Sequence, residues 1–426
     1  MRIGIFSQWY EPEPGPAALP AVLGRALADR GHEVHVLTGF PNYPSGKLAP
    51  GYRQALRKRE VLGGVSVTRV PLYLSHDSSA LRRVANYSSF AVSAALLGVP
   101  PFPPIDALWV NYSPITIGVP MWLQQLIHGT PTVCEVGDLW PDTLSVAGLR
   151  GSGSLAEHAN GLLSGWCKAM YATSDAVAYI SPSVGEILAS RGVPRDRLHY
   201  IPKPANEAVF HVGGRSLRQE LAIDENALVL VYAGTMGAAQ GLDSLIEACG
   251  LVDDPRLVVI MAGSGTHETE LRSSAGKLPA GRIRFLGRVP QARVADLLAT
   301  CDAAFISLAD HPSSAMTMPS KTQSTLASGT AILAAANGDL AALVENSRVG
   351  ITAAPGNSRS IAAALTTLVS MGRPSLAKMG TRARRLYETE FSVSHIASQA
   401  EELLGAIAGA PQRGVRRFTP GKVASA

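Results

Sequence analysis

The strongest constraint on the fold is a pattern of short apolar runs that alternate with helix-period segments, and this pattern occurs twice. The first series comprises MRIGIF, HEVHVLT, Ile105–Val110, Thr132–Val136, Asp175–Ile180 and Leu198–Ile201. The second series opens at Ala227 and comprises LVLVYAG, RLVVIMAG, RIRFLG, DAAFISL, TAILAA and the short VGITA. Repeated strand, helix, strand order predicts parallel sheets covered by helices on both faces. The fold class is therefore α/β, with two Rossmann-like doubly wound domains.

The domain boundaries follow from length and from one irregular segment. At 426 residues the chain exceeds a single typical core. Residues 201–213, IPKPANEAVFHVG, interrupt both patterns with two early prolines and are predicted to be the linker. We expect an N-terminal domain at 1–202 and a C-terminal domain at 215–388. We also expect a final helix at 389–410 and a flexible basic tail at 411–426.

Composition indicates a soluble globular protein of the cytoplasm. Hydrophobic residues make up 46% and charged residues 17% of the chain. The start, MRIGIFSQWY, does not resemble a secretory signal, and the longest apolar run, 90–99, is shorter than the ~20 residues of a spanning helix. The four cysteines are far apart in apolar segments, which predicts buried thiols in a reducing compartment.

The positive charge of the chain is clustered. The formal charge is +5, and basic residues gather at 53–59 and at Arg82 and Arg83. Such clusters suit peripheral contact with anionic lipid at the inner face of the membrane, or they are simply a solvated surface. Nucleic acid is a poor candidate partner because no aromatic interleaving or recognition motif accompanies the charge.

In the first half, the loops after the predicted strands carry candidate site residues, since ligands of doubly wound sheets bind at the carboxyl ends of strands. Gly15 leads into a helix whose free N–H groups favour an anion, although a plain turn is the alternative. Asn42 and Tyr43 suit a polyhydroxylated ligand, or belong to a proline-stiffened loop. In GDLWPD, Asp138 can accept a hydroxyl hydrogen bond beside Trp140, or it caps the following helix.

The second half has glycine loops after its strands. Thr235, Gly237 and Gln240 lie in GTMGAAQG, which opens a helix but is neither a P-loop nor GxGxxG. Gly265 belongs to a second, weaker glycine loop. The Arg288–Val289 pair in GRVP can offer a guanidinium and backbone groups to a nucleobase, or is an ordinary surface segment.

The stretch PSKTQSTLASG carries the strongest signal of charge chemistry. Pro319 and Ser320 fit a helix entry, with Ser320 a candidate N-cap, so Lys321 falls in the first turn. A cation there opposes the helix dipole by ~0.3–1 kcal/mol when exposed. A phosphate bound at the same helix end would reverse that cost, which favours an anion site. The alternative is a solvated lysine whose stem covers apolar surface.

Together these motifs resemble a GT-B glycosyltransferase of family GT4, nearest the bacterial branch for capsule and O-antigen sugars that includes fucosamine transferases. The carriers, in the family's order, are LADRGHEVHVLTGFPNYPSGK, GDLWPD, YAGTMGAAQGL, GSG, FLGRVP, PSKTQSTLASGTAIL and YETEFS. The resemblance implies a retaining transferase that uses a nucleotide-activated sugar, with UDP the expected nucleotide. The acceptor would be a polysaccharide precursor or a specialised metabolite, and the final helix would cross back to the first domain.

The resemblance also implies roles for the candidate residues. Lys321, Asp138 and Gln240 would be catalytic, and Asn42, Tyr43 and Trp140 would face the acceptor. The donor would be bound by Gly15, Thr235, Gly237, Gly265, Arg288, Val289, Pro319, Ser320 and Ser324. The chain has no DxD motif, so neither a metal nor another cofactor is required. Donors fixed at the diphosphate would stabilise charge on the leaving oxygen, and a phosphate oxygen can take the acceptor proton.

Two departures from the family pattern leave other functions open. Met316 and Ser324 stand where many members have glutamates, and Thr235 and Gln240 stand where many have Arg and Lys. Asp339 is a candidate replacement for the glutamate that holds the ribose. A nucleotide-sugar 2-epimerase of the same fold and an inactive nucleotide-sugar-binding subunit are the alternatives. The sequence leaves the sugar, the acceptor and the oligomeric state open.

Overall fold

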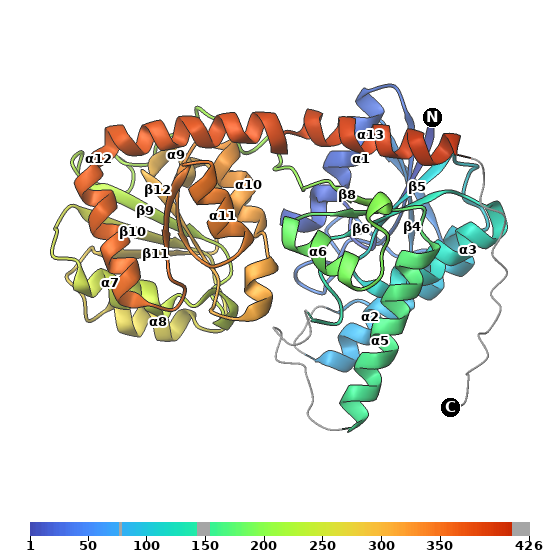
Figure 1. The fold of residues 1–426 in the computed structure, drawn as a ribbon, viewed down its shortest axis with the longest axis horizontal. Helices are drawn as coiled ribbons and strands as arrows, with labels where there is room; N and C mark the ends of the chain where they lie inside the picture. The colour runs from blue at the N-terminus through green and yellow to red at the C-terminus, as the bar shows by residue number, and fades with distance from the viewer. Residues whose placement is uncertain (76–78, 143–153, 411–426) are drawn as a thin grey trace.

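The computed structural model describes residues 1–75, 79–142 and 154–410. It contains an eight-stranded and a six-stranded sheet, each built from one half of the chain. Figure 1 shows the two domains side by side, with the last two long helices running along one edge of both. The predicted α/β class with two doubly wound domains is confirmed.

The N-terminal sheet has the strand order β3-β4-β2-β1-β5-β6-β7-β8. Its strands are β1 (Arg2–Phe6), β2 (Glu33–Gly39), β3 (Lys58–Leu62), β4 (Val65–Val70), β5 (Ala107–Asn111), β6 (Thr132–Val136), β7 (Ala176–Tyr179) and β8 (Leu198–Tyr200). All neighbouring pairs are parallel except β3 with β4. The carboxyl ends of the parallel strands therefore meet along one edge of the sheet.

The C-terminal sheet has the order β11-β10-β9-β12-β13-β14, and all of its pairs are parallel. Its strands are β9 (Leu228–Ala233), β10 (Leu257–Ala262), β11 (Ile283–Gly287), β12 (Ala303–Ser307), β13 (Ala331–Ala335) and β14 (Gly350–Ala353). The two central strands, β9 and β12, are almost wholly buried, as expected for a sheet covered on both faces.

Helices cover both sheets. In the N-terminal domain they are η1 (Gly15–Ala18), α1 (Leu19–Asp29), α2 (Ala80–Ser93), η2 (Ala94–Gly98), η3 (Ile115–Ile117), α3 (Gly118–His128), α5 (Ser154–Thr173), α6 (Pro182–Ser190) and η4 (Arg195–Arg197). In the C-terminal domain they are η5 (Ala238–Gln240), α7 (Asp243–Leu251), α8 (Glu268–Ala275), α9 (Gln291–Thr300), η6 (Pro312–Met316), α10 (Ser320–Ala327), α11 (Asp339–Asn346), α12 (Ser358–Leu386) and η7 (Tyr387–Phe391). The described residues contain no helix that is long and apolar enough to span a membrane.

The β3–β4 hairpin is absent from the sequence prediction, which treats 53–59 only as a basic cluster. Gly63 and Gly64 form its two-residue turn, with φ of +54° and +78°. Positive φ at both turn residues suits the right-handed twist of a hairpin, and two glycines adopt it without strain. The Gly-Gly pair between KREVL and VSVTRV is the signal that could have revealed this hairpin.

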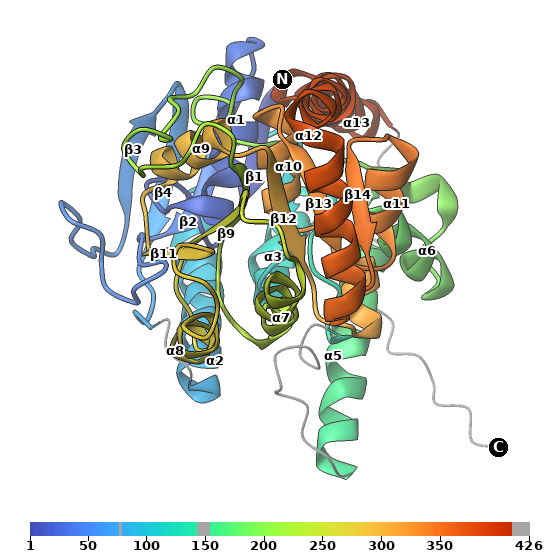
Figure 2. The same ribbon diagram turned by 90° about the vertical axis from the view of Figure 1, so that its left-hand side faces the viewer.

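The chain crosses between the domains twice. The linker after β8 is the first crossing, and η7 followed by α13 (Val393–Gly409) is the second. α12 is kinked at Gly372, and Figures 1 and 2 show its second part and α13 lying along the same edge of the molecule. Ile396, Leu403 and Leu404 of α13 are buried in the core of the N-terminal domain. Glu401 accepts hydrogen bonds from Arg30 Nε at 2.7 Å and contacts His32 at 2.9 Å.

Candidate active site

The carboxyl ends of β9 and β10 bring the two glycine loops of the second domain into backbone contact. A Cβ on Gly263 would lie 1.8 Å from the carbonyl oxygen of Gly234, and a Cβ on Gly265 would lie 2.1 Å from that of Met236. Met236 N–H donates to the Ser264 carbonyl at 3.0 Å. Gly265 is thus required by loop packing whether or not a ligand is bound, so its predicted donor contact stays a prediction.

Lys321 lies beside these loops, in the first turn of α10. Its Nζ is 4.1 Å from the centre of the Tyr232 ring, and a Cβ on Gly234 would lie 2.7 Å from it. Lys321 as a whole is half-buried, and its ammonium has no carboxylate partner among the described residues. Burial alone lowers the pKa of Lys321 from 10.5 to about 7. A desolvated cation with no counter-ion, at a helix N-terminus, is electrostatically suited to an anionic ligand.

The neighbours of Lys321 differ in part from expectation. Pro319, not Ser320, is the N-cap residue, and it cannot offer a side-chain hydrogen bond. The predicted N-cap role of Ser320 is therefore wrong, because α10 already begins at Ser320 with its hydroxyl exposed. Ser324 lies one turn further on, where its Oγ donates to the Ser320 carbonyl at 3.4 Å. Ser320 and Ser324 remain candidates for donor contact on the exposed side of this turn.

Gln240 has a structural partner within its own loop. Its Oε1 accepts the Gly237 N–H at 3.1 Å, and its own N–H donates to the Gly237 carbonyl at 3.1 Å, so Gln240 and Gly237 close η5. Its backbone carbonyl accepts a hydrogen bond from Ser307 Oγ at 2.5 Å, which ties the loop to the end of β12. Thr235 is exposed, and its carbonyl accepts a hydrogen bond from the buried Tyr232 hydroxyl. Because the side-chain oxygen of Gln240 is already bonded, its predicted catalytic role would have to use the side-chain amide nitrogen. Otherwise Gln240 would act only by positioning the loop.

Arg288 and Val289 follow β11, one strand further along the sheet. Arg288 is exposed, and Val289 packs partly against the core beside β9. The turn that presents them is fixed by Gly287, whose φ is +67° and whose carbonyl accepts the Gly263 N–H at 2.7 Å. The structure places this pair at the same edge as the two glycine loops.

In the N-terminal domain, Gly15 begins η1 with φ of +67° and with nothing within 4 Å of a Cβ position. The open space leaves its backbone accessible to a ligand. The preceding loop is held by Glu13, a buried carboxylate that the sequence analysis missed. Glu13 accepts N–H groups of Tyr10 at 3.1 Å, Asn42 at 2.8 Å and Tyr43 at 2.9 Å. Burial, as the largest cause, raises the pKa of Glu13 to about 7.

Asn42 and Tyr43 have different environments. Asn42 is 3% exposed, and its amide nitrogen donates to the Phe40 carbonyl at 3.0 Å. That amide therefore shapes the loop, and a direct contact with an acceptor stays a prediction. Tyr43 is half-buried and lies edge-on to Trp9, with ring centres 6.4 Å apart. Trp9 also meets Tyr87 of α2 at 6.1 Å, so three aromatic rings gather after β1 and β2.

The GDLWPD loop follows β6 on the same edge of the sheet. Asp138 is exposed and accepts a hydrogen bond from Ser113 Oγ at 3.0 Å. The alternative, a cap on the following helix, concerns residues 143–153, which lie outside the described part of the chain. The Trp140 carbonyl accepts a hydrogen bond from Arg191 at 3.1 Å, and the same guanidinium pairs with Asp142. The structure thus brings Asp138 and Trp140 into one anchored loop.

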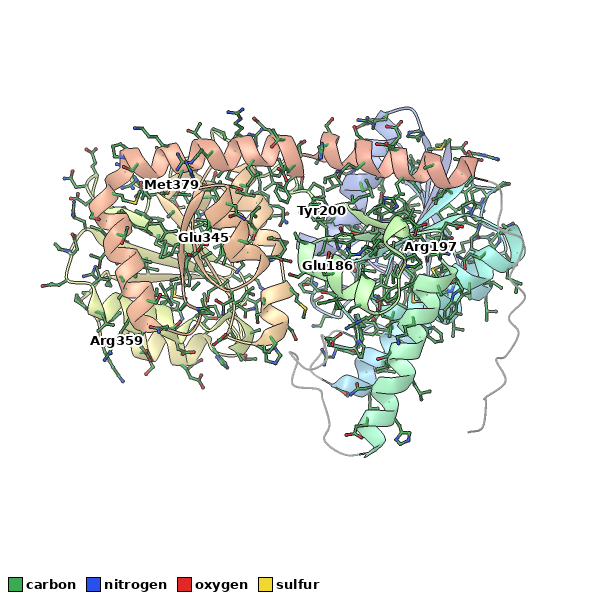
Figure 3. The ribbon with its side chains drawn as sticks, viewed as in Figure 1. Glu186, Arg197, Tyr200, Glu345, Arg359 and Met379 are labelled. Carbon is green, nitrogen blue, oxygen red and sulfur yellow. The ribbon has the colours of Figure 1, made fainter. Side chains whose placement is uncertain are left out.

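Asp339, the suggested replacement for a donor-site glutamate, is bonded to the N-terminal domain. Its carboxylate accepts Ser183 N–H at 3.0 Å and Ser183 Oγ–H at 2.7 Å, across the boundary between the domains. Figure 3 labels Glu186 on the same helix, α6, at the side of the N-terminal domain that faces the C-terminal domain. Ser181 Oγ donates to the Met316 carbonyl at 2.9 Å nearby. The Asp339 carboxylate thus has a structural partner at the start of α6, and its suggested contact with a ribose stays a prediction.

Comparison with known proteins decides the family. The model of the glycosyl transferase 4-like domain matches residues 15–204, and that of glycosyl transferases group 1 matches residues 215–386. The chain is a GT4-type glycosyltransferase of the GT-B fold. Its predicted membership is confirmed at this level, while the narrower fucosamine branch stays a prediction.

Relatives of the glycosyltransferase agree with this assignment. It is 29% identical over 293 residues to the putative colanic acid biosynthesis glycosyl transferase WcaI of Escherichia coli K12. The aligned residues make up 67% of this chain and 71% of WcaI. The fold matches Anabaena HepE in complex with UDP and glucose, with TM-score 0.69, 18% identity, and 95% of this chain and 100% of that chain covered. It also matches sucrose-phosphate synthase of Thermosynechococcus elongatus, with TM-score 0.70, 17% identity and coverage of 95% and 98%.

Proposed function

We propose that this glycosyltransferase moves a sugar from a nucleoside diphosphate sugar, with UDP as the nucleotide, onto a carbohydrate or specialised-metabolite acceptor. The observation that carries the proposal is the ammonium of Lys321. It is desolvated, has no carboxylate partner among the described residues, and lies between the start of α10 and the loop at Gly234. A diphosphate would supply the missing counter-charge and accept hydrogen bonds from the adjacent N–H groups.

The proposed reaction uses the groups that face this anion site. As the bond from sugar to diphosphate breaks, negative charge grows on the leaving oxygen, and Lys321 would stabilise it without reorganisation. The acceptor would lie against the loops that carry Tyr43 and Asp138. We propose transfer with retention, in which the acceptor attacks the face that the diphosphate leaves and a phosphate oxygen takes its proton. This route requires no metal ion, and product formation should therefore persist in the presence of EDTA.

The HepE structures bear on the nucleotide. They are described as complexes with UDP, with UDP-glucose, and with UDP and glucose. These ligands belong to HepE, and at 18% identity the likeness shows the fold alone; we extend UDP to the present chain as part of the proposal. No described feature favours 2-epimerisation or an inactive subunit, so the proposal is confined to transfer.

Isothermal titration with UDP, GDP and dTDP tests the donor. We expect UDP to bind most tightly and Lys321→Met to weaken it about 10–100-fold, because a charge-assisted contact to phosphate is lost. Lys378→Met is the matched control, because Lys378 is an exposed lysine on α12. The donor assignment is overturned if none of the three nucleotides binds, or if both variants bind UDP with the same affinity as the parent protein. NMR of the product's anomeric proton would test retention.

A further inference from the structure

One side of the N-terminal domain has a helix whose apolar face points outward. Along α2 and η2, Leu81 is 83% exposed, Val84 59%, Val92 55% and Leu96 67%. Spacings of three, eight and four residues place these four side chains on one side of the helix. The opposite side is buried and includes Asn86 and Phe90. Phe90 and Ala94 pack in the core on that buried side, so the helix carries apolar side chains on both of its sides, whereas surface helices normally have a polar outer side.

The neighbouring helix also exposes apolar side chains. α3 packs against α2 and η2. It exposes Val119 at 37%, Leu126 at 71% and Ile127 at 49%. Figures 1 and 2 both show α2 and α5 extending below the N-terminal domain, away from the edge that α13 follows. We call Leu81, Val84, Val92, Leu96, Val119, Leu126 and Ile127 the α2–α3 face.

The sequence around the α2–α3 face carries charges of both signs, and its arginines lie at the ends of the face. Between residues 77 and 131 the acidic residues are Asp77 and Asp106, and the Asp106 carboxylate is paired with Arg2 at 3.1 Å. Arg82 and Arg83 lie in the first turn of α2. At the other end, exposed Arg59 donates to the Pro101 carbonyl at 3.1 Å, just beyond η2. The apolar surface thus has arginines at both ends.

We propose that the α2–α3 face docks on an anionic lipid bilayer. Leucine and valine side chains would enter the boundary between headgroups and acyl chains, while the flanking guanidinium groups would pair with lipid phosphates. A second copy of the chain is the poorer occupant, because a two-fold contact sets the same patch against itself and brings arginines of like charge together. This docking does not depend on which nucleotide the enzyme uses.

The inner side of α2 connects docking with the acceptor loops. Asn86 Oδ1 accepts a hydrogen bond from Gln8 Nε2 at 2.6 Å, immediately after β1. Tyr87 lies edge-on to Trp9, and Trp9 meets Tyr43. A bilayer in contact with the outer side of α2 would therefore lie one helix diameter from the loops proposed to face the acceptor. If the proposed transfer is correct, docking here selects an acceptor that is anchored in lipid.

Flotation of the full-length protein with vesicles tests docking directly. The probes are vesicles of phosphatidylglycerol mixed with phosphatidylcholine, and vesicles of phosphatidylcholine alone. The test variant is L81Q/V84Q/V92Q/L96Q, and the matched control is Leu251→Gln, since Leu251 is 59% exposed on the other domain. UDP binding and the circular dichroism spectrum are measured for every variant, to establish that each one is folded.

We expect binding to anionic vesicles that is lost in the quadruple variant, unchanged in L251Q and weakened by salt. R82Q/R83Q should weaken binding about tenfold or more, since each arginine near an anionic surface contributes to attraction. Absence of binding by the parent protein would overturn the proposal. So would equal binding to neutral vesicles, or a parent dimer in sedimentation that the quadruple variant abolishes. Failure of UDP binding with intact flotation would instead contradict the donor assignment alone.

Discussion

The ammonium of Lys321 is the residue on which the chemistry of the site depends, and its surroundings set its protonation. Burial lowers its pKa to about 7, whereas it titrates near 10.5 without burial. Between pH 7 and pH 10.5, Lys321 is protonated in the unfolded chain but largely neutral in the folded, unliganded protein. The free energy of unfolding should therefore rise with pH across this window. A bound diphosphate would favour the charged form and raise the pKa again.

This difference predicts that UDP binding takes up a proton. At roughly pH 8.5 most of the free protein would have neutral Lys321, and the complex would have it charged, so uptake should approach about one proton per UDP. Titration calorimetry in buffers of different ionisation enthalpy measures this number. In Lys321→Arg the side chain stays charged, and the uptake should vanish. Equal uptake in both proteins would show that another group titrates.

A second residue-scale prediction concerns the contact between the glycine loops. Gly263→Ala would set a Cβ 1.8 Å from the Gly234 carbonyl oxygen, at a φ of +135°. We expect the free energy of unfolding to fall by roughly 2–4 kcal/mol and UDP affinity to fall with it, because both loops must move apart. Thermal and urea unfolding measure the first, and calorimetry the second.

Gly165→Ala supplies the matched control. Gly165 lies inside α5 with nothing within 4 Å of a Cβ position. Replacement by alanine should raise the free energy of unfolding by up to about 1 kcal/mol, since alanine favours the helix. If the two substitutions had the same effect, loop contact would not be the reason for glycine at 263.

At the scale of elements, the loops at the strand ends could be predicted from the sequence, because the spacing of apolar residues and the turn residues are local signals. The residues that hold those loops in place could not be predicted, because they are distant in the sequence. Glu13 is bonded to N–H groups 29 and 30 residues away, and Asp339 to Ser183, 156 residues away. Lys321 could be identified from the sequence because a cation in the first turn of a helix is unfavourable, and that position is a local feature. The partner of Asp339 could not be predicted, because only the packing of the domains brings α6 to it.

One element-scale prediction concerns the linker. Lys203, between two prolines, places its Nζ 3.5 Å from Glu135 Oε1, and Glu135 Oε2 accepts the indole N–H of Trp109 at 3.1 Å. A Cβ on Gly137 would lie 3.1 Å from the same Nζ, so the ammonium underlies the GDLWPD loop. Lys203→Met should lower the free energy of unfolding by roughly 1–3 kcal/mol, because Glu135 loses its cationic partner and keeps only the Trp109 N–H.

We expect the same substitution to lower kcat, through the loop that carries Asp138, and to leave the Kd of UDP unchanged. The double variant E135Q/K203M should recover part of the lost stability, since no unpaired charge remains. Steady-state kinetics, calorimetry and urea unfolding supply the three measurements. Strictly additive effects in the double variant would mean that the two side chains do not interact.

At the scale of the whole molecule, the last helix joins the two domains. α13 leaves the C-terminal domain through η7 and buries Ile396, Leu403 and Leu404 in the N-terminal core. Leu404→Ala should lower the free energy of unfolding by roughly 2–5 kcal/mol, because a wholly buried side chain is removed. Glu402→Ala, an exposed change on the same helix, should have little effect. Calorimetric unfolding would show whether the N-terminal transition alone shifts.

The two chain crossings are bonded to each other. Glu207 of the linker accepts hydrogen bonds from the Tyr387 hydroxyl at 2.9 Å and from Val393 N–H at 2.8 Å, and Ala205 N–H donates to the same hydroxyl at 3.2 Å. Two adjacent connections would act as one hinge, and opening about it would break the hydrogen bonds of Asp339 with Ser183 and of Ser181 with Met316. If the proposed transfer is correct, the sugar and the acceptor would then meet along the same arc in every catalytic cycle.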